Sequence, residues 1–210
     1  MKLKYYGHAC FTLCFASGTT LAIDPFDGSV TYAPCDAICD AALLSHDHFD
    51  HNHTASLRGD FAVLREAGSY DVRDVHVTAV PSFHDKKGGA LRGRNLIFRI
   101  EGDGLTIVHL GDLGHMPDEE QLRSISGADV LLVPIGGTYT IDTPEAEELI
   151  RLAQPKHAVA MHFRTPDYDF NTSTCEAFAH DMHAVRMPRE VEITPETLSS
   201  LPEAMILSYK

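Results

Sequence analysis

The chain has 210 residues, of which 44% are hydrophobic, and its length suits a single domain spanning residues 1–210 with a sizeable core. Its 30 acidic residues outnumber the 17 basic ones, which argues against long nucleic acid as a partner because a phosphate backbone is bound mainly by Lys and Arg. No stretch has the length and hydrophobicity of a membrane span, and residues 1–6 lack the apolar core of a signal peptide, so we expect a soluble, cytoplasmic protein.

The first half of the chain predicts mainly strands. Short apolar or β-branched segments separated by turn residues are typical of strands. Such segments cover residues 3–6, 11–15, 20–23, 41–44, 75–80, 95–100 and 105–109. Glu101-Gly102-Asp103-Gly104, between the last two of these segments, predicts a hairpin turn.

Helices are predicted in the second half. Pro117-Asp118-Glu119-Glu120 begins one helix that ends near Ser124, and Thr143-Pro144-Glu145 begins another that ends near Ala153. Acidic residues in the first turn of each complement the helix dipole. A third helix is predicted over residues 174–183, and buried strands over residues 129–133, 157–161 and 204–208. Strands and helices in this order predict an α/β (α+β) fold.

Five cysteines are spread over the chain. Two pairs have Cys-x-x-x-Cys spacing, and Cys10 and Cys14 fall in an apolar stretch where alternate residues share a face. We therefore expect reduced thiols in the core rather than metal ligands, and the same for Cys35 and Cys39.

The densest cluster of polar residues directly follows the strand at residues 41–44. It reads His46-Asp47-His48-Phe49-Asp50-His51. Residues i and i+2 of an extended segment point the same way, so His46 and His48 can hold one metal ion together. Asp50 and His51 come after the chain turns and can reach a second ion, roughly 3.5–4 Å from the first in sites of this kind. This pattern predicts a metal-dependent enzyme rather than a solvated loop that is rich in histidine.

Three later strands also end in histidine or carboxylate. The strand that begins at residue 75 leads to His84, the strand at 105–109 leads to Asp112 and His115, and the strand at 157–161 leads to His162. Rigid elements that deliver such side chains at one end are a feature of metal sites.

These motifs resemble those of the metallo-β-lactamase-fold hydrolases, in the branch of compact metal-dependent hydrolases similar to L-ascorbate-6-phosphate lactonase. The resemblance covers nearly the whole chain, through residues 6–11, 23–26, 46–51, 82–84, 109–112, 133–137 and 161–165. It implies a four-layer αββα sandwich with two metal ions at one edge, between the two sheets.

The resemblance also implies the ligands. Three histidines would bind one ion: His46, His48 and His84. Three residues would bind the other: Asp50, His51 and His162. Asp112 would bridge the pair. Zinc is the expected ion, although manganese or iron would also accept these ligands.

Three further residues would support the centre. Asp24 would orient a ligand histidine through hydrogen bonds. His8 lies in a Gly-His-Ala turn that would lie beside the metals and contact the substrate or stabilise developing charge. His115 would approach the site from beyond Asp112.

The implied chemistry is hydrolysis. A hydroxide bridged between two divalent cations forms near neutral pH, because metal binding lowers the pKa of water from 15.7 to about 7. It would cleave a small-molecule ester, lactone or phosphodiester, with Asp112, Asp50 and His8 as the catalytic candidates. A nuclease or a di-iron oxidoreductase of the same fold, or a non-catalytic metal-binding protein, remain alternatives.

Substrate recognition is predicted from the segment that follows His84. It combines four basic residues with three glycines, and could hold a phosphate or carboxylate of an anionic substrate; a flexible solvated loop is the alternative. The basic candidates in this segment are Lys86, Lys87, Arg92 and Arg94. Three residues outside the segment are further candidates for the wall of the substrate pocket: Tyr139, Thr140 and Arg164. Related compact hydrolases often self-associate, which leaves a homo-oligomer open.

Overall fold

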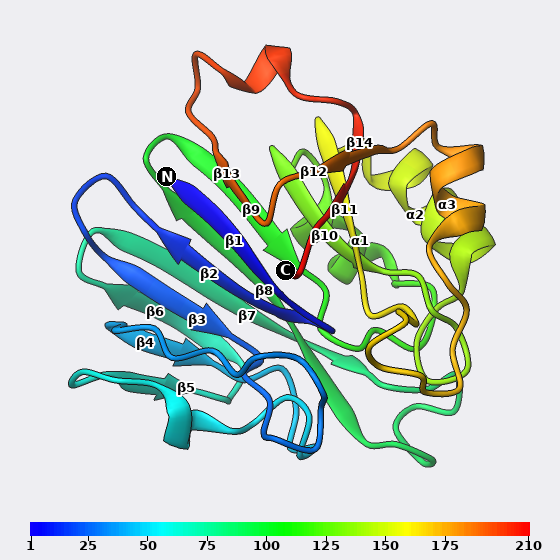
Figure 1. Ribbon diagram of the computed structural model, residues 1–210, viewed down its shortest axis with the longest axis horizontal. Coiled ribbons are helices and arrows are strands. Elements are labelled where there is room, and N and C mark those ends of the chain that lie inside the picture. Colours follow the sequence, from blue (N-terminus) through cyan, green and yellow to red (C-terminus); the bar gives the residue numbers. More distant parts are fainter.

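The computed structural model describes residues 1–210 and contains two β-sheets packed face to face (Figure 1). The strands of the first sheet are β1 (Lys2–Gly7), β2 (Cys10–Cys14), β3 (Thr20–Ile23), β4 (Ala41–Leu43), β5 (Ala62–Leu64) and β13 (Glu190–Glu192). They lie in the order β13-β1-β2-β3-β4-β5. Because β1, β3 and β4 run in the same direction, their carboxyl ends share one edge of the sheet.

The second sheet has eight strands. They are β6 (Gly68–Val72), β7 (Val75–Phe83), β8 (Arg94–Gly102), β9 (Leu105–His109), β10 (Val130–Pro134), β11 (His157–Met161), β12 (Val185–Met187) and β14 (Ala204–Leu207). Their order is β12-β14-β11-β10-β9-β8-β7-β6. β9, β10 and β11 are parallel, and β7 runs in the same direction because both β7 and β9 are antiparallel to β8.

The main core lies between the two sheets. Alternate residues of β1, such as Leu3 and Tyr5, face inward and are buried, as the two-residue period of a strand requires. They join Phe11, Leu13 and the inward residues of the second sheet in one cluster of 50 buried side chains. A cluster of this size fixes the relative position of the two sheets, and therefore of the loops at their edge.

Three α-helices pack on one face of the eight-stranded sheet (Figure 1). They are α1 (Glu119–Ile125), α2 (Thr143–Ala153) and α3 (Glu176–Asp181). α1 and α2 each begin with a capping box, in which Asp118 pairs with Gln121 and Asp142 pairs with Glu145. Two short 3₁₀ helices cover Thr54–Ser56 and Leu198–Ser200.

The outer layer on the six-stranded sheet is built differently. No α-helix covers it; the segment at residues 24–40 and the 3₁₀ helix at residues 54–56 follow its strands instead. A second apolar cluster joins this segment to the outward residues of the sheet: Tyr6, Cys10, Ala22, Phe26, Val30, Tyr32, Cys35, Cys39, Ala42 and Leu57. All five cysteines are free thiols, as expected, and four of them are buried. The outermost layer on this side is therefore a packed loop.

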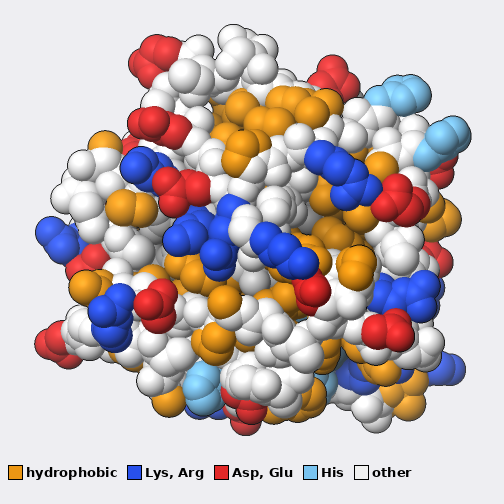
Figure 2. Space-filling view, viewed as in Figure 1, with side chains coloured by type: hydrophobic (Ala, Val, Ile, Leu, Met, Phe, Trp, Pro, Cys, Tyr) orange, Lys and Arg blue, Asp and Glu red, His pale blue; other side chains and the backbone are white.

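Most predicted elements are present with small shifts in their ends. The helix predicted at residues 174–183 is shorter, because only Glu176–Asp181 is helical. Four short strands were not predicted: β5, β6, β12 and β13. None of the helices combines the length and the hydrophobicity needed to cross a membrane. Lys and Arg side chains are interspersed with Asp and Glu on the face in Figure 2, which shows no continuous basic surface.

Candidate metal centre

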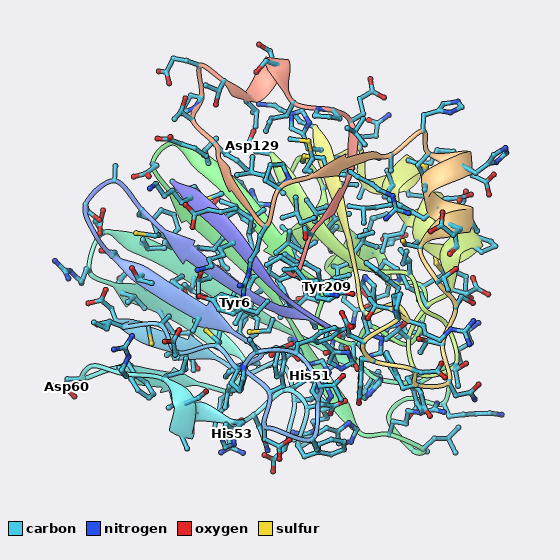
Figure 3. The ribbon with its side chains drawn as sticks, viewed as in Figure 1. Tyr6, His51, His53, Asp60, Asp129 and Tyr209 are labelled. Carbon is cyan, nitrogen blue, oxygen red and sulfur yellow. The ribbon has the colours of Figure 1, made fainter.

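Six strands deliver polar side chains to one edge of the sandwich. Each of these residues lies just beyond the carboxyl end of a strand: His8 after β1, Asp24 after β3, His46 after β4, His84 after β7, Asp112 after β9 and His162 after β11. Figure 3 shows His51 at this edge, among the loops between the sheets, whereas Asp60 and Asp129 lie at distant edges. The parallel direction of the strands brings these residues together.

Asp112 lies at the centre of the cluster. Its Oδ2 atom lies 3.0 Å from Nε2 of His162, 3.3 Å from Nε2 of His84 and 3.4 Å from Nε2 of His51. The Nε2 atom of His46 is 3.9 Å away. One carboxylate thus faces four imidazoles that come from both sheets, in the arrangement expected of a bridging ligand.

The imidazoles form two groups on either side of Asp112. Donor atoms of His46, His48 and His84 lie within 4.8 Å of one another, which is the trio predicted for one ion. On the other side the close trio is His8, His51 and His162.

Asp50, expected in the second group, lies at its margin. Its Oδ2 atom is 4.0 Å from Nε2 of His51 and 3.1 Å from Nε2 of His8. His8 therefore lies at hydrogen-bond distance from Asp50.

Hydrogen bonds orient several of these side chains. Asp24 is fully buried; its Oδ2 lies 3.1 Å from Nδ1 of His51, and its two oxygens accept bonds from the Ser45 amide and hydroxyl. The Ser45 hydroxyl also lies 2.9 Å from Nδ1 of His46. In both histidines the Nε2 atom is left to face Asp112. Such contacts fix ring orientation at metal sites.

The backbone at this edge departs from ordinary geometry. His8, Asp24 and His162 have φ values of 57°, 46° and 52°, in the left-handed region that few residues other than glycine adopt. Backbone strain of this kind concentrates at functional sites. The His162 amide donates to the His8 carbonyl at 2.7 Å, which ties the two turns together across the sheets.

Two glycines allow the ligand-bearing turns to approach one another. A side chain at Gly136 would overlap the backbone carbonyl of His162, and a side chain at Gly114 would overlap the backbone of His84 and Asp85. No larger residue fits either position without moving a proposed ligand.

Burial controls the charge of the imidazoles. Burial lowers the pKa of His84 and of His8 to about 4, and lowers the pKa of His46 well below its ordinary value. At neutral pH these rings are neutral, which is the form that binds metal. His51 differs: burial acts to lower its pKa, but the Asp112 and Asp24 carboxylates outweigh burial and raise it.

The donor atoms fit divalent metal ions. His46 Nε2, His51 Nε2 and Asp112 Oδ1 are buried and have no hydrogen-bond partner in the protein. Buried polar atoms almost always have partners, so three unpartnered donors in one cluster require an explanation. Imidazole nitrogen and carboxylate oxygen are ligands that zinc accepts, and a cation would satisfy all three.

A cavity of about 530 Å³, here called the metal-side cavity, opens onto the centre. Asp50, His84, Asp112 and His162 lie in its wall. The remaining lining residues are Asp47, His48, Phe49, Arg92, Tyr139, Tyr168 and Phe170.

An aromatic wall covers one side of the metal-side cavity. The rings of Tyr168 and Phe170 stack at 4.6 Å, and Tyr139 stacks on Phe170 at 6.2 Å. The rings of His162 and Phe170 are arranged edge to face, with their centres 5.3 Å apart. Phe49, Tyr168 and Phe170 were not predicted as lining residues: Phe49 lies within the histidine-rich motif but is not a metal ligand, and no motif or periodicity marks Tyr168 or Phe170.

The residues suggested for substrate contact lie in different places in the structure. Arg92 and Tyr139 line the metal-side cavity, and the Arg92 guanidinium lies 5.3 Å from the centre of the Tyr139 ring. Lys86 instead pairs with Glu145 outside this cavity. Arg164 lines a separate cavity, and its guanidinium pairs with Asp169 at 3.5 Å.

Three other expectations need correction or qualification. Arg94 lines a neighbouring cavity rather than this one. His8 is buried behind Asp50 and is absent from the cavity wall, so it cannot contact a substrate there. The ring of His115 bonds to the Phe83 amide and the Met116 carbonyl rather than to a ligand histidine.

Comparisons with known proteins agree with this fold. The family model of the "Beta-lactamase superfamily domain" matches residues 2–162. A UPF0173 metal-dependent hydrolase of Carboxydothermus hydrogenoformans is 29% identical over 194 residues, covering 79% of this chain and 85% of that protein. A second protein of that name, from Methanoregula boonei, is 30% identical over 191 residues and covers 79% and 83%.

A solved structure is similar over its full length. It is a Thermotoga maritima protein designated a Zn-dependent hydrolase of the metallo-β-lactamase superfamily, and it matches with a TM-score of 0.80, 33% identity and 99% coverage of both chains. The predicted fold is thereby confirmed, while the narrower likeness to ascorbate-phosphate lactonase stays a prediction. The chain belongs to the beta-lactamase superfamily, with the metallo-β-lactamase fold and with metal-dependent hydrolases among its relatives.

Proposed function

We propose that this protein is a binuclear metal-dependent hydrolase that cleaves an ester, lactone or phosphodiester bond of a small molecule. One observation carries the proposal: the Asp112 carboxylate faces Nε2 atoms of four histidines, at 3.0 to 3.9 Å. A purely structural cluster would pair these donors with hydrogen-bond acceptors of the protein. Here two imidazole nitrogens, His46 Nε2 and His51 Nε2, and the carboxylate oxygen Asp112 Oδ1 have no hydrogen-bond partner, in a buried cluster beside a cavity.

His46, His48 and His84 would hold one ion. His51 and His162 would hold the other with Asp50, and Asp112 would contact both. Zinc is the ion we propose, because the ligands are nitrogen and oxygen donors and the Thermotoga maritima relative is designated Zn-dependent. When bound, the two ions supply Lewis acidity toward a carbonyl or phosphoryl oxygen and lower the pKa of water to about 7.

The residues of the chain supply orientation and proton transfer. Oδ1 of Asp112 has no protein partner and can accept a proton from an attacking water. The Asp112 amide donates to Oδ1 of Asn95 at 2.9 Å, which holds the turn in place. Asp50 lines the cavity and is oriented by His8 behind it. The aromatic wall gives the cavity one apolar side.

The test combines metal removal with an activity panel. Purified protein is treated with chelator, and hydrolysis of an ester, a lactone and a phosphodiester is measured before and after zinc, manganese or iron is added. We expect at least one substrate to be cleaved only with metal, and Asp112→Asn to lose at least 10²-fold in kcat with the fold intact. Full metal occupancy without turnover on any substrate would favour a non-catalytic metal-binding protein, and oxygen consumption with iron would favour an oxidoreductase.

A further inference from the structure

A second cavity adjoins the metal-side cavity. This arginine cavity has a volume of about 420 Å³ and shares Asp47, His48 and Arg92 with the metal-side cavity. Its wall also contains His46, so it lies beside the proposed metal centre. A substrate cleaved at the metals can therefore extend past His48 into this space.

The arginine cavity is rich in basic side chains, although the protein as a whole is acidic. Three arginines line it, and only Arg65 is paired, with Asp47 at 3.3 Å. Arg92 and Arg94 have no carboxylate within 4.0 Å, although the chain carries a formal net charge of −13. Glu66 is the other acid in the wall. Two guanidinium groups are thus left without counter-charges next to the centre.

A buried carboxylate holds the loop that carries Arg92. Asp85 is 2% exposed, and its Oδ1 accepts the amides of Lys87 at 2.7 Å and Gly89 at 3.1 Å. Its Oδ2 accepts the amides of Leu91 at 2.9 Å and Arg92 at 2.7 Å. These four bonds to one side chain hold the backbone of the loop that carries Arg92. Arg94 follows at the start of β8, where the sheet fixes its backbone.

We infer that the arginine cavity is a subsite for an anionic group of the substrate, a phosphate or a carboxylate, that lies outside the bond to be cleaved. A guanidinium presents a planar fork of donors that matches either group, and a pre-positioned arginine loses little conformational freedom on binding. Arg92 lies in the walls of both cavities, so it would hold the anion at a fixed distance from Asp112. This inference rests on the proposed function and narrows its substrate to acidic small molecules.

Anion binding can be measured without turnover. Inorganic phosphate and succinate are titrated separately into the metal-containing protein by isothermal calorimetry, and their relative affinities distinguish the two kinds of anion. The variants are Arg92→Gln, Arg94→Gln and the double substitution; the side chains are partly or fully exposed, so the fold is not at risk. Arg123→Gln, which removes an exposed and unpaired arginine from α1, is the matched control. Metal content is measured for every variant.

We expect at least one anion to bind the wild-type protein with a millimolar or lower Kd. The Kd should rise several-fold in each single variant and at least tenfold in the double variant, with metal content unchanged and Arg123→Gln within twofold of wild type. No binding to the wild-type protein would overturn the inference. Equal binding to the wild type and the double variant would also overturn it, because the anion would then bind at the metals rather than at the arginines. Loss of binding in the double variant, together with no hydrolysis of any substrate, would support the anion site and reject the proposed function.

Discussion

The Asp24 carboxylate lies 3.1 Å from Nδ1 of His51, and both side chains are fully buried. The contact leaves Nε2 of His51 facing Asp112. Because Asp24 also accepts two bonds from Ser45, one carboxylate sets the position of both His51 and the turn that carries His46. The metal centre therefore depends on a residue that does not itself reach the cavity.

Replacing Asp24 should weaken metal binding. We expect Asp24→Ala to lower the affinity for zinc by 10- to 100-fold, because residues that orient ligand histidines contribute about this much. Competition with a chromophoric chelator measures the affinity. Asp27→Ala is the control, since Asp27 lies on the same loop and its side chain accepts hydrogen bonds only from Ser29. Equal affinities in the two variants would show that the Asp24 contact does not orient the ligand.

A methyl group at Gly136 should displace His162. The new Cβ would overlap the His162 carbonyl, so Gly136→Ala should reduce metal content toward one ion per chain and lower activity by at least tenfold. Gly28→Ala adds the same methyl group in open space on a loop and should change neither quantity. Elemental analysis of both variants gives the answer, and two ions in Gly136→Ala would contradict the assignment of His162.

The loop tied down by Asp85 should affect binding more than chemistry. In Asp85→Ala the four amides lose their acceptor, and we expect KM for an anionic substrate to rise about tenfold with a smaller change in kcat. Hydrogen exchange at the amides of residues 87–92 should accelerate. Asp60→Ala serves as the control, because Asp60 is exposed and lies just before β5, at the opposite end of that strand from the metal centre. A fall in kcat alone would indicate that Asp85 acts through the neighbouring His84.

The carboxyl end of the chain should stabilise the aromatic wall. The Tyr209 hydroxyl donates to Asp167 at 2.6 Å, one residue before Tyr168 in the wall. Tyr209→Phe removes this bond and leaves the aromatic ring in place. We expect faster hydrogen exchange at the amides of Tyr168 and Phe170, and a several-fold lower kcat/KM, with metal content unchanged. Protection identical to that of the wild type would show that the contact is dispensable.

The buried histidines should make the metal-free protein sensitive to acid. His8 and His84 have a pKa of about 4 in the folded state, against about 6.5 in an unfolded chain. Between these values the unfolded chain binds more protons, so the free energy of unfolding should fall as the pH is lowered from 6.5 to 4. Urea unfolding at several pH values measures how the free energy of unfolding depends on pH. His8→Gln should flatten the dependence, whereas the exposed substitution His183→Gln should not.

The sequence predicted the parts of the site that are contiguous or that follow strongly apolar strands. His46 to His51 lie in one segment, and His84, Asp112 and His162 each follow a β-branched or apolar run. Their meeting at one edge follows from the shared direction of those strands. The strands β5 and β13 were not predicted, because each has only three residues, two of them exposed, and distant partner strands decide their pairing.

Other parts of the site arise only from tertiary contacts. Tyr168 and Phe170 belong to a loop with no hydrophobic period, yet they pack on His8 from the other end of the chain. The role of Asp85 could not be predicted either, because nothing in the sequence indicates that this one acid in a basic segment accepts hydrogen bonds from four backbone amides. Long-range packing, rather than local pattern, positions these residues.

The number of metal ions bound per chain shows whether the histidine cluster is a binuclear centre. Protein purified without a histidine tag is analysed for zinc, manganese and iron, together with Asp112→Ala and the exposed control Asp60→Ala. We expect two ions per chain in the wild type and the control, and fewer in Asp112→Ala, because that carboxylate faces the histidines of both groups. No tightly bound metal in the wild type, or the same two ions in Asp112→Ala, would contradict the binuclear centre.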